Sequence, residues 1–288
     1  MFSVFACVLS VRGVWVRRVA IALLGASALA LAPVHAREGV EVGGNSAFSK
    51  LVPADEVEQS AGVQYAEMLA KAQQQRALAG KDHPQLQRLR AMARRIIPYA
   101  VEWNPRAKDW QWEVNLIGSK QINAFCMPGG KIAFYTGILD TLKLTDDEAA
   151  MVMGHEIAHA LREHARERMG KNAATGLGAN LLSQVLGLGQ VGQTVTQYGA
   201  QLLTLKFGRE DESEADLVGL ELAARAGYDP RAGITLWQKM AAANKNAPPQ
   251  WLSTHPAGET RIADIQAALP QVMPIYTKAQ KPPRPGVP

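Results

Sequence analysis

The sequence predicts a mainly helical α+β fold in which a small β-sheet precedes a central helix. Apolar and polar residues alternate over 110–117, and two short strand-like segments follow at 122–127 and 131–136, the last after a Pro-Gly-Gly turn. Thr145 and Glu148 then form a capping box, which predicts the start of a helix. The chain has 288 residues, 47% of them hydrophobic and 20% charged, which suits one large globular domain.

The N-terminal segment 1–36 has the order of a secretory signal peptide. Three arginines between positions 12 and 18 precede an uncharged run over 19–31, and Val34-His35-Ala36 is a small-residue cleavage site. The run is short for a membrane span, so we expect export to a bacterial periplasm, with an uncleaved inner-membrane anchor as the alternative. Without this segment 28 basic and 26 acidic residues remain and no basic stripe with aromatics is present, so nucleic acid is not an expected partner.

The remaining chain divides into three parts. Residues 37–54 are rich in glycine and polar residues and are predicted to be a flexible lead-in. The domain over 55–273 begins with two helices, at 55–78 and 85–99, ahead of the predicted sheet. Residues 274–288 form a proline-rich tail that we expect to be disordered.

The helix after the sheet carries the segment His155-Glu156-Ile157-Ala158-His159. Two histidines four residues apart lie on one face of a continuous helix and can bind one zinc ion. Glu156 lies one step round the helix, where it can act as a base on zinc-bound water rather than as a ligand. The helix is predicted to continue to Gly170, which turns His164 towards solvent.

A catalytic zinc needs a third protein ligand, and the first acidic cluster after a long acid-free gap is the candidate. In this cluster Glu212 and Asp216 are four residues apart, on a face that continues through the small residues Gly219 and Ala223. Such a face suits one metal ligand and one partner of a ligand, packed closely against another helix. The alternative is an acid-rich first turn that complements the helix dipole.

The dipole explanation is the preferred one for the other three acidic residues of this cluster, Glu210, Asp211 and Glu214.

Four motifs resemble the zinc metallopeptidase family that contains the CAAX prenyl endopeptidase, the heat-shock peptidase HtpX and the periplasmic BepA-type peptidases. They are Asn123-Ala124-Phe125 with Pro128-Gly129-Gly130-x-Ile132, His155-Glu156-x-x-His159, Arg209-x-x-Glu212-x-Glu214-Ala215-Asp216, and Ser253-Thr254-His255-Pro256 with Arg261. The resemblance implies a zincin-like domain of the gluzincin type, with HExxH and ExxxD motifs and one Zn²⁺ per chain. It also implies that Glu212 is the third ligand and that Asp216 steadies a zinc-bound histidine.

Residues 172–205 separate the two predicted ligand-bearing helices and contain no acidic residue. Repeated glycines among Ala, Leu and Gln predict a helical lid or insertion. Both a mobile lid and a partly buried insertion are compatible with this composition. A membrane hairpin is less compatible, because Asn180, Ser183 and Gln184 interrupt the apolar run, and membrane association stays open.

The predicted sheet directly precedes the histidine helix, so a free strand edge is expected to hold an extended substrate peptide across the zinc. We assign Lys131, Ile132, Ala133 and Phe134 to this edge.

His255 has two predicted roles at the centre. As an inhibitory fourth ligand it would displace water from the open zinc position, and as a hydrogen-bond donor it would stabilise the oxyanion of the transition state. Arg261, six residues further on, is expected to help to fix the position of His255. A hydrogen-bonded histidine at a loop-to-helix junction, with neither role, is the third alternative.

These features predict a zinc metalloendopeptidase in which Glu156 takes a proton from water and passes one to the leaving amine. By the resemblance, its substrates would be unfolded or misassembled envelope proteins in protein quality control. The alternative is a periplasmic chaperone or assembly factor, with outer-membrane assembly machinery as its partner, that uses the same cleft with little turnover.

Overall fold

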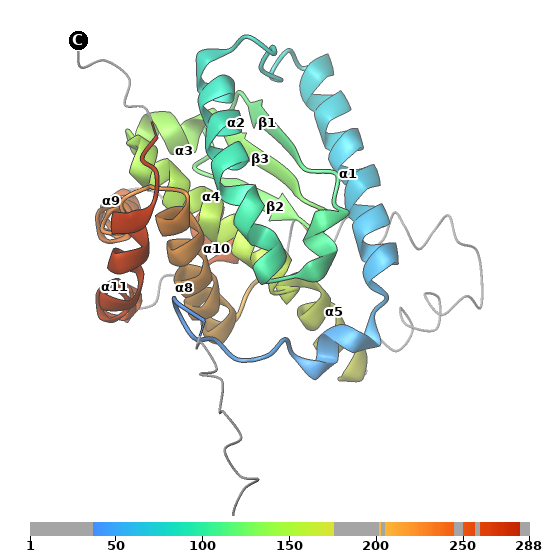
Figure 1. Cartoon of the computed structure of the whole chain (residues 1–288). Helices are drawn as coiled ribbons and strands as arrows, with labels where there is room; N and C mark the ends of the chain where they lie inside the picture. Colours follow the sequence, from blue (N-terminus) through green and yellow to red (C-terminus); the bar gives the residue numbers. More distant parts are fainter. Residues whose placement is uncertain (1–36, 176–201, 203–204, 245–249, 257–259, 283–288) are drawn as a thin grey trace, which may run out of the picture. The chain divides into compact units, whose positions relative to one another are not determined.

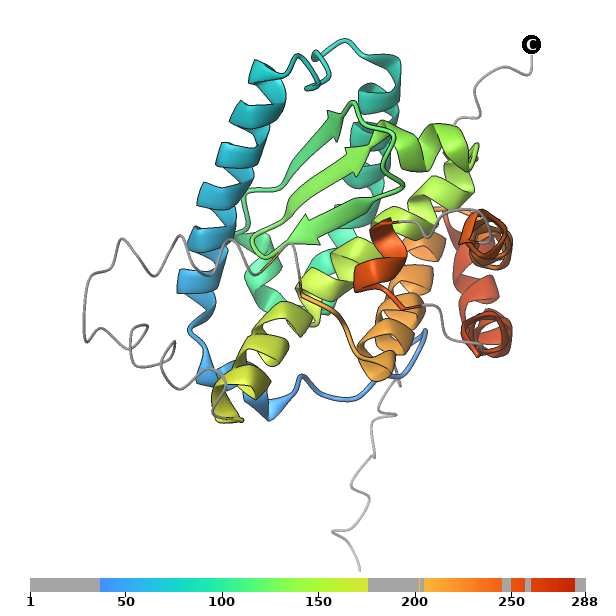
Figure 2. The same ribbon diagram turned by 180° about the vertical axis from the view of Figure 1, so that it is seen from behind.

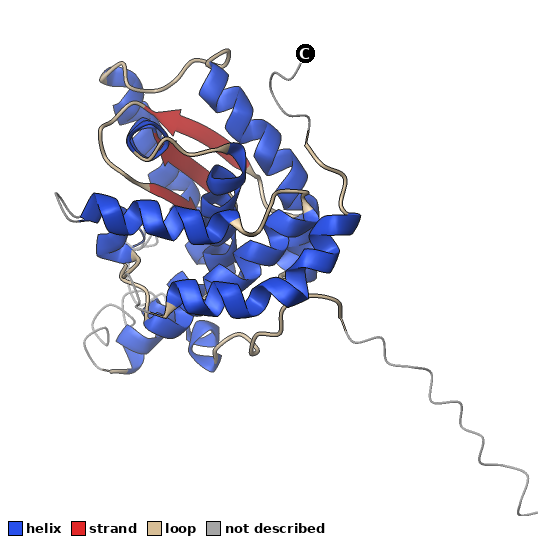
Figure 3. Cartoon of the chain, turned by 90° about the vertical axis from the view of Figure 1, so that its left-hand side faces the viewer, coloured by secondary structure: helices blue, strands red, loops and turns tan. Residues whose placement is uncertain are grey.

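The structure, a computed structural model, describes residues 37–175, 202, 205–244, 250–256 and 260–282. Its elements, in chain order, are η1 (Ala47–Leu51), α1 (Ala54–Gln74), α2 (Pro84–Ile96), η2 (Ile97–Glu102), η3 (Pro105–Lys108), β1 (Glu113–Ile117), β2 (Ala124–Met127), β3 (Lys131–Tyr135), α3 (Thr136–Thr141), α4 (Asp146–Leu161), α5 (His164–Ala174), α8 (Arg209–Arg225), α9 (Ala232–Asn244), α10 (Gln250–Thr254) and α11 (Arg261–Lys278). The η elements are 3₁₀ helices. In the described part of the chain, helices dominate and one small sheet precedes α4, which confirms the predicted fold class (Figures 1 and 3).

The three strands lie in the order β1-β3-β2, with β3 parallel to β1 and antiparallel to β2. Helix α2 lies across one face of the sheet, as the two opposite views show (Figures 1 and 2). The turn between β2 and β3 depends on Gly129 and Gly130, whose φ angles of 81° and 79° favour glycine. The chain therefore folds back at this turn and places β3 in the middle of the sheet.

The assignment of the substrate-binding edge to residues 131–134 is wrong. Ala133 pairs with Asn115 of β1 on one side and with Phe125 of β2 on the other, so β3 has no free edge. The sequence predicts strands one by one, whereas their order in space depends on long-range pairing. The edge strand that contacts α4 is β2.

Helices α4 and α8 cross at two glycines. A Cβ atom on Gly154 would lie 2.5 Å from the backbone oxygen of Gly219, and one on Gly219 would lie 2.6 Å from the backbone nitrogen of His155. The two backbones are therefore in direct contact, as the small residues of the α8 face predict. This contact places the first turns of α8 beside the histidines of α4.

We expect Gly219→Ala to lower the melting temperature of the zinc-free protein and to weaken zinc binding, because α8 must move away from α4. Overpacking of this kind costs about 1–3 kcal/mol. Gly233→Ala in α9 is the matched control, since its Cβ would meet side-chain atoms of Ile265 at an ordinary 3.5 Å. Thermal unfolding and zinc titration of both variants test this, and equal behaviour of the two would exclude the crossing as the constraint on the site.

The histidine-bearing helix is not continuous to Gly170, contrary to the prediction. Helix α4 ends at Leu161, Glu163 adopts a left-handed conformation with φ 58°, and α5 begins at His164. Gly170 lies inside α5, where a Cβ atom would collide with the backbone oxygen of Phe48. No residue type near the break forbids a helix, so long-range contacts, such as those of Arg162 with Gly43 and Glu214, set it.

The ends of the domain are more ordered than predicted. Val40 and Val52 are buried, and the backbone N–H of Val40 donates to the buried carboxylate of Glu221 at 2.8 Å, so the segment 37–54 packs against the domain at these two residues. Helix α11 continues through Pro274 to Lys278, into the predicted tail. Pro274 is exposed, so the hydrogen bond that it cannot make faces solvent.

Two predicted segments lie largely outside the described residues. These are the signal segment 1–36 and most of 172–205, of which 172–174 end α5. Among the helices that the structure describes, none combines the length and the apolar character needed to cross a membrane.

Candidate metal centre

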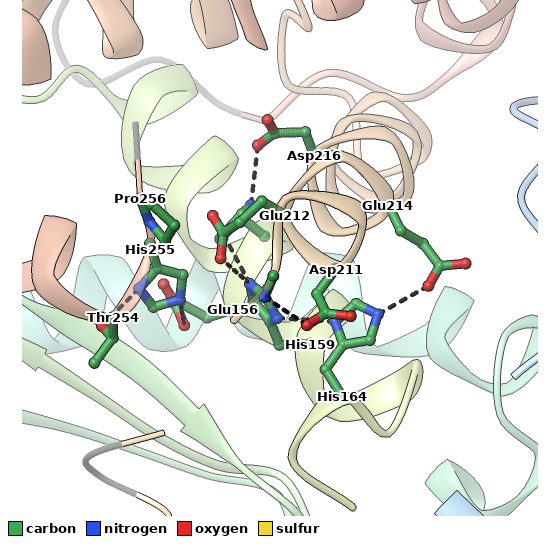
Figure 4. A network of polar contacts seen from close by, with 12 residues as sticks. Glu156, His159, His164, Asp211, Glu212, Glu214, Asp216, Thr254, His255 and Pro256 are labelled. Atoms are coloured by element: carbon green, nitrogen blue, oxygen red, sulfur yellow. Dashed lines mark hydrogen bonds and ion pairs between the residues drawn. The ribbon is translucent and has the colours of Figure 1, made fainter. Parts of the chain in front are cut away.

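Four buried side chains converge between α4, α8 and α10. His155 and His159 come from α4, Glu212 from the first turn of α8, and His255 follows α10 directly. Their potential ligand atoms all lie within 4.8 Å of one another. Figure 4 shows His159, Glu212 and His255 pointing towards this centre. Helical spacing on α4 and the glycine contact with α8 bring together the first three as the sequence predicts.

The geometry of this cluster fits a bound cation. The Nε2 atoms of His155 and His159 are 3.0 Å apart. Glu212 Oε2 is 3.7 Å from Nε2 of His155, and Glu212 Oε1 is 3.5 Å from Nε2 of His159. Glu212 Oε1 and His255 Nε2 are buried and have no hydrogen-bond partner. Buried polar atoms without partners are costly, and a metal ion between them would satisfy all of them. Imidazole and carboxylate ligands in a set of four suit zinc.

His155 is held from behind by Asp216 and Arg261. Its Nδ1 atom is 3.0 Å from Asp216 Oδ1. Arg261 donates hydrogen bonds to both carboxylate oxygens of Asp216, from Nε at 2.6 Å and from Nη2 at 2.7 Å. Burial alone would raise the pKa of Asp216, but the charge of Arg261 and the hydrogen bonds lower it to about 2. Asp216 is therefore ionised and accepts a hydrogen bond from the Nδ1–H group of His155. The lone pair on Nε2 of His155 can then bind a metal. Burial lowers the pKa of His155 to about 4, which keeps the ring neutral at pH 7.

Arg261 also donates to Glu212 Oε2 at 2.5 Å. Its closest contact near His255 is the backbone oxygen of Pro256 at 3.4 Å. Arg261 thus reaches the His255 segment only through the backbone of Pro256, while its guanidinium group is mainly occupied by the two carboxylates of α8. Burial raises the pKa of Glu212 to about 9, so a metal ion that binds must displace a proton from this carboxyl group.

Glu156 faces the centre but lies outside the ligand cluster. Its Oε1 accepts a 2.5 Å hydrogen bond from the indole N–H of Trp251, and the backbone of Cys126 in β2 also hydrogen-bonds the carboxyl group. Burial raises the pKa of Glu156 to about 8. A raised pKa and a fixed orientation are the properties of a general base, the role that the motif predicts.

His255 occupies the fourth side of the cluster. Its ring stacks on Trp251, with centroids 4.7 Å apart and an angle of 16° between the planes. Nδ1 is 3.1 Å from the backbone oxygen of Trp251, which can only accept, so Nδ1 carries the proton and Nε2 has a free lone pair. Burial lowers the pKa of His255 well below its usual range, so the ring is neutral. This state favours the inhibitory ligand over the oxyanion donor.

His164 does not face solvent, contrary to the prediction. The break between α4 and α5 turns it back towards α4, where it lies within hydrogen-bonding distance of His159 and Glu214. Glu214 is therefore more than a residue that complements the helix dipole, and it also pairs with Arg162. The dipole explanation holds better for Asp211, which accepts from the Gly208 backbone N–H at the start of α8.

A pocket opens beside the cluster. The whole of β2 lines it together with Glu156, His159 and His255, and apolar side chains extend it on the side of α5 and the segment before α8. These apolar residues are Ala160, Ala165, Leu202, Leu205 and Phe207. The outer edge of β2, with which no strand of the described residues pairs, and a candidate base therefore border the same cavity.

Two aromatic residues of the site are absent from the prediction. Trp251 lies four residues before His255, and this spacing on a helix is the signal that could have identified it. Phe207 stacks on the His159 ring, with centroids 3.9 Å apart, and comes from the chain before α8, where no pattern marks it.

The comparisons with known proteins agree with this geometry. A family model described as peptidase family M48 matches residues 84–269. The mitochondrial metalloendopeptidase OMA1 of Arabidopsis thaliana is 39% identical over 171 residues, which are 59% of this chain and 34% of the relative. The OMA1 protein of Schizosaccharomyces pombe is 37% identical over 166 residues, 57% of this chain and 48% of the relative.

A bacterial relative matches as well. The β-barrel assembly-enhancing protease of Escherichia coli O157:H7 is 32% identical over 178 residues, 58% of this chain and 36% of the relative. The chain thus spans between about a third and a half of the length of these relatives. The family match includes all four residues of the cluster, His155, His159, Glu212 and His255. The chain belongs to peptidase family M48, the zinc metallopeptidase family that its motifs predict.

Proposed function

We propose that the chain is a zinc-dependent endopeptidase that cleaves unfolded or misassembled envelope proteins in the periplasm. The observation that carries this proposal is the position of Glu156. Its carboxyl group is held in place outside the ligand cluster, in a pocket that the outer edge of β2 also borders. Such an arrangement serves water activation beside a bound peptide.

His155, His159 and Glu212 would hold the zinc. When bound, zinc would act as a Lewis acid that polarises a carbonyl group and lowers the pKa of water. Glu156 takes a proton from the attacking water and delivers one to the leaving amine. Trp251 holds Oε1 of Glu156 during both transfers, because its indole N–H has this oxygen as its acceptor.

The edge of β2 is the proposed place for the substrate. An extended peptide that adds to this edge forms backbone hydrogen bonds, which do not depend on side chains. This mode of recognition requires an unfolded segment, so it favours misfolded or unassembled proteins as substrates. The apolar wall around Leu205 and Phe207 would take an apolar side chain of such a segment.

The proposed compartment rests on the order of charged and apolar residues in 1–36 and on one relative. That relative is named for β-barrel assembly, and other relatives are named as mitochondrial, so the comparisons support a protease without naming its compartment. We propose outer-membrane proteins and their assembly machinery as substrates and partners. Cell fractionation tests the compartment, and recovery of the chain in the cytoplasm would contradict it.

The proposed activity is tested with an unfolded protein as substrate. Purified protein with one zinc per chain should cleave it, and a chelator should stop the cleavage. A second candidate function, an assembly factor with little turnover, is favoured by the lone pair of His255 that faces the cluster. The peptidase and the assembly factor are distinguished by the rate at which an unfolded protein is cleaved after the His255 ring is removed.

His255→Ala is expected to raise cleavage of an unfolded protein by about tenfold or more and to weaken zinc binding moderately, because a neutral imidazole no longer fills the fourth position. Ser253→Ala, an exposed change in α10, is the control. Initial cleavage rates and zinc titration measure both effects. A loss of about a hundredfold would instead assign His255 as an oxyanion donor, and parental rates with parental zinc affinity would leave it no role at the metal.

A further inference from the structure

Arg261 lies behind the cluster and binds two carboxylates of α8. Its Nε and Nη2 atoms donate to the two oxygens of Asp216 at 2.6 Å and 2.7 Å, and Nη1 donates to Glu212 Oε2 at 2.5 Å. The N–H groups of a guanidinium group lie in its plane, so these three hydrogen bonds hold Arg261 by its edges. The orientation of Glu212 at the cluster therefore depends on the plane in which the guanidinium group lies.

The flat face of this guanidinium group contacts an indole ring from another helix. The ring centroid of Trp237 in α9 is 3.7 Å from Cζ of Arg261, and the two residues are only 5% and 3% exposed. Helix α9 packs against both α4 and α11, and Arg261 is the first residue of α11 (Figures 1 and 2). The attraction between a cation and the face of Trp is strongest where water is excluded. The ring therefore restrains the tilt of the guanidinium group, which the hydrogen bonds at its edges restrain less.

Trp237 is itself held in place by a second indole. Its ring centroid is 5.4 Å from that of Trp251, which is 1% exposed and donates to Glu156. A cavity of about 20 Å³ beside these two rings is also lined by His155 and Asp216. A smaller side chain in place of Trp237 would enlarge this cavity, so the guanidinium group would have room to tilt.

We infer that Trp237 is a positioning residue of the metal centre, because its ring fixes the plane of Arg261. The arginine in turn orients Glu212 and Asp216. Trp237 belongs neither to the ligand cluster nor to the residues that line the pocket beside it. It therefore acts through Arg261 rather than by contact with zinc or substrate. The inference rests on the proposed role of Glu212 as a zinc ligand.

The contact between Trp237 and Arg261 can be measured without zinc. In NMR spectra of the zinc-free parental protein, the ring current of the indole should shift the side-chain N–H protons of Arg261 upfield. The two Nη groups should give separate signals, because the guanidinium group does not rotate freely. In Trp237→Leu the upfield shift should vanish and the rotation should become about tenfold faster. Trp237→Phe keeps an aromatic face, so it should retain a smaller shift and slow rotation.

Arg261 signals without an upfield shift in the parental protein would overturn the inference, because the guanidinium group would then not lie over the ring. Rotation of the guanidinium group at the parental rate in Trp237→Leu would overturn it as well, because the hydrogen bonds to α8 would then suffice to hold Arg261.

Zinc affinity gives the second measurement. Trp237→Leu should bind zinc about tenfold more weakly than the parental protein, at the lower end of the loss expected for a group that supports a ligand. Trp237→Phe should stay within a few fold of the parental affinity. Trp110→Leu is the matched control, because it removes an indole that is 8% exposed in the same core and contacts Glu58 and Trp112. Equal affinities for Trp237→Leu and Trp237→Phe, or an equal loss in Trp110→Leu, would overturn the inference.

These results separate the inference from the proposed function. A parental protein that binds no zinc would contradict the proposed function, while NMR of the zinc-free protein would still decide whether Trp237 holds Arg261. Thermal unfolding of each zinc-free variant shows whether it folds. If Trp237→Leu does not fold, the parental Arg261 signals decide, together with Trp237→Met, which keeps more volume but has no aromatic face.

Discussion

The Glu156→Gln protein is expected to bind one zinc per chain and to cleave an unfolded protein about 10²- to 10⁴-fold more slowly than the parental chain. The amide has nearly the same shape as the carboxylate and can still accept the hydrogen bond from Trp251. It cannot take a proton from water. The fold and the metal centre therefore stay in place, and only the proton transfer is lost.

Initial cleavage rates at matched zinc content measure this effect. Glu67→Gln, the same change at an exposed position in α1, should behave as the parental protein does. If Glu156→Gln cleaves at nearly the parental rate, Glu156 is not the base, and another group must receive the proton.

Replacing Glu212 by glutamine should lower zinc affinity by more than about a hundredfold, beyond the 10- to 100-fold expected for a residue that only supports a ligand. Glutamine can still accept from Arg261, so the guanidinium group keeps a partner and the fold is preserved. Asp216→Asn is the matched comparison, because it changes a supporting carboxylate on the same helix. A larger loss in Asp216→Asn than in Glu212→Gln would reverse the roles given to the two residues.

The pH dependence of zinc binding is the control for this result. Burial raises the folded-state pKa of Glu212 to about 9, from a usual value of 4.5. The protonated Glu212 side chain therefore contributes its full stability to the zinc-free protein below pH 4.5, and this contribution is lost as the pH rises through about 9. Zinc must displace this proton, so zinc affinity should rise with pH by up to about tenfold per unit. Glu212→Gln should show a smaller slope, and an unchanged slope would mean that another group releases the proton.

The metal-binding face of α4 and its pairing with α8 follow from the sequence because both depend on helical periodicity. His155 and His159 share a face at any position in a regular helix, and Gly219 marks a helix face that another backbone can touch. The acid-free gap before α8 reduces the choice of a third ligand to one short cluster. These are local properties, which the sequence contains directly.

Other features of the site depend on contacts between distant parts of the chain. The break at Glu163 has no glycine or proline to mark it, and an assumed straight helix sends His164 to the wrong side. The position of β3 in the sheet depends on which strands pair, and the alternation of residues 131–135 says nothing about that. Phe207 reaches His159 only because the chain before α8 returns to the centre.

The most direct test of the zinc centre is anomalous X-ray scattering at the zinc absorption edge, from crystals of the protein loaded with zinc. We expect one peak per chain, about 2.0–2.2 Å from Nε2 of His155, Nε2 of His159 and a carboxylate oxygen of Glu212. A peak at other residues, or no peak between these three in zinc-loaded protein, would contradict the proposed centre and the peptidase mechanism that depends on it.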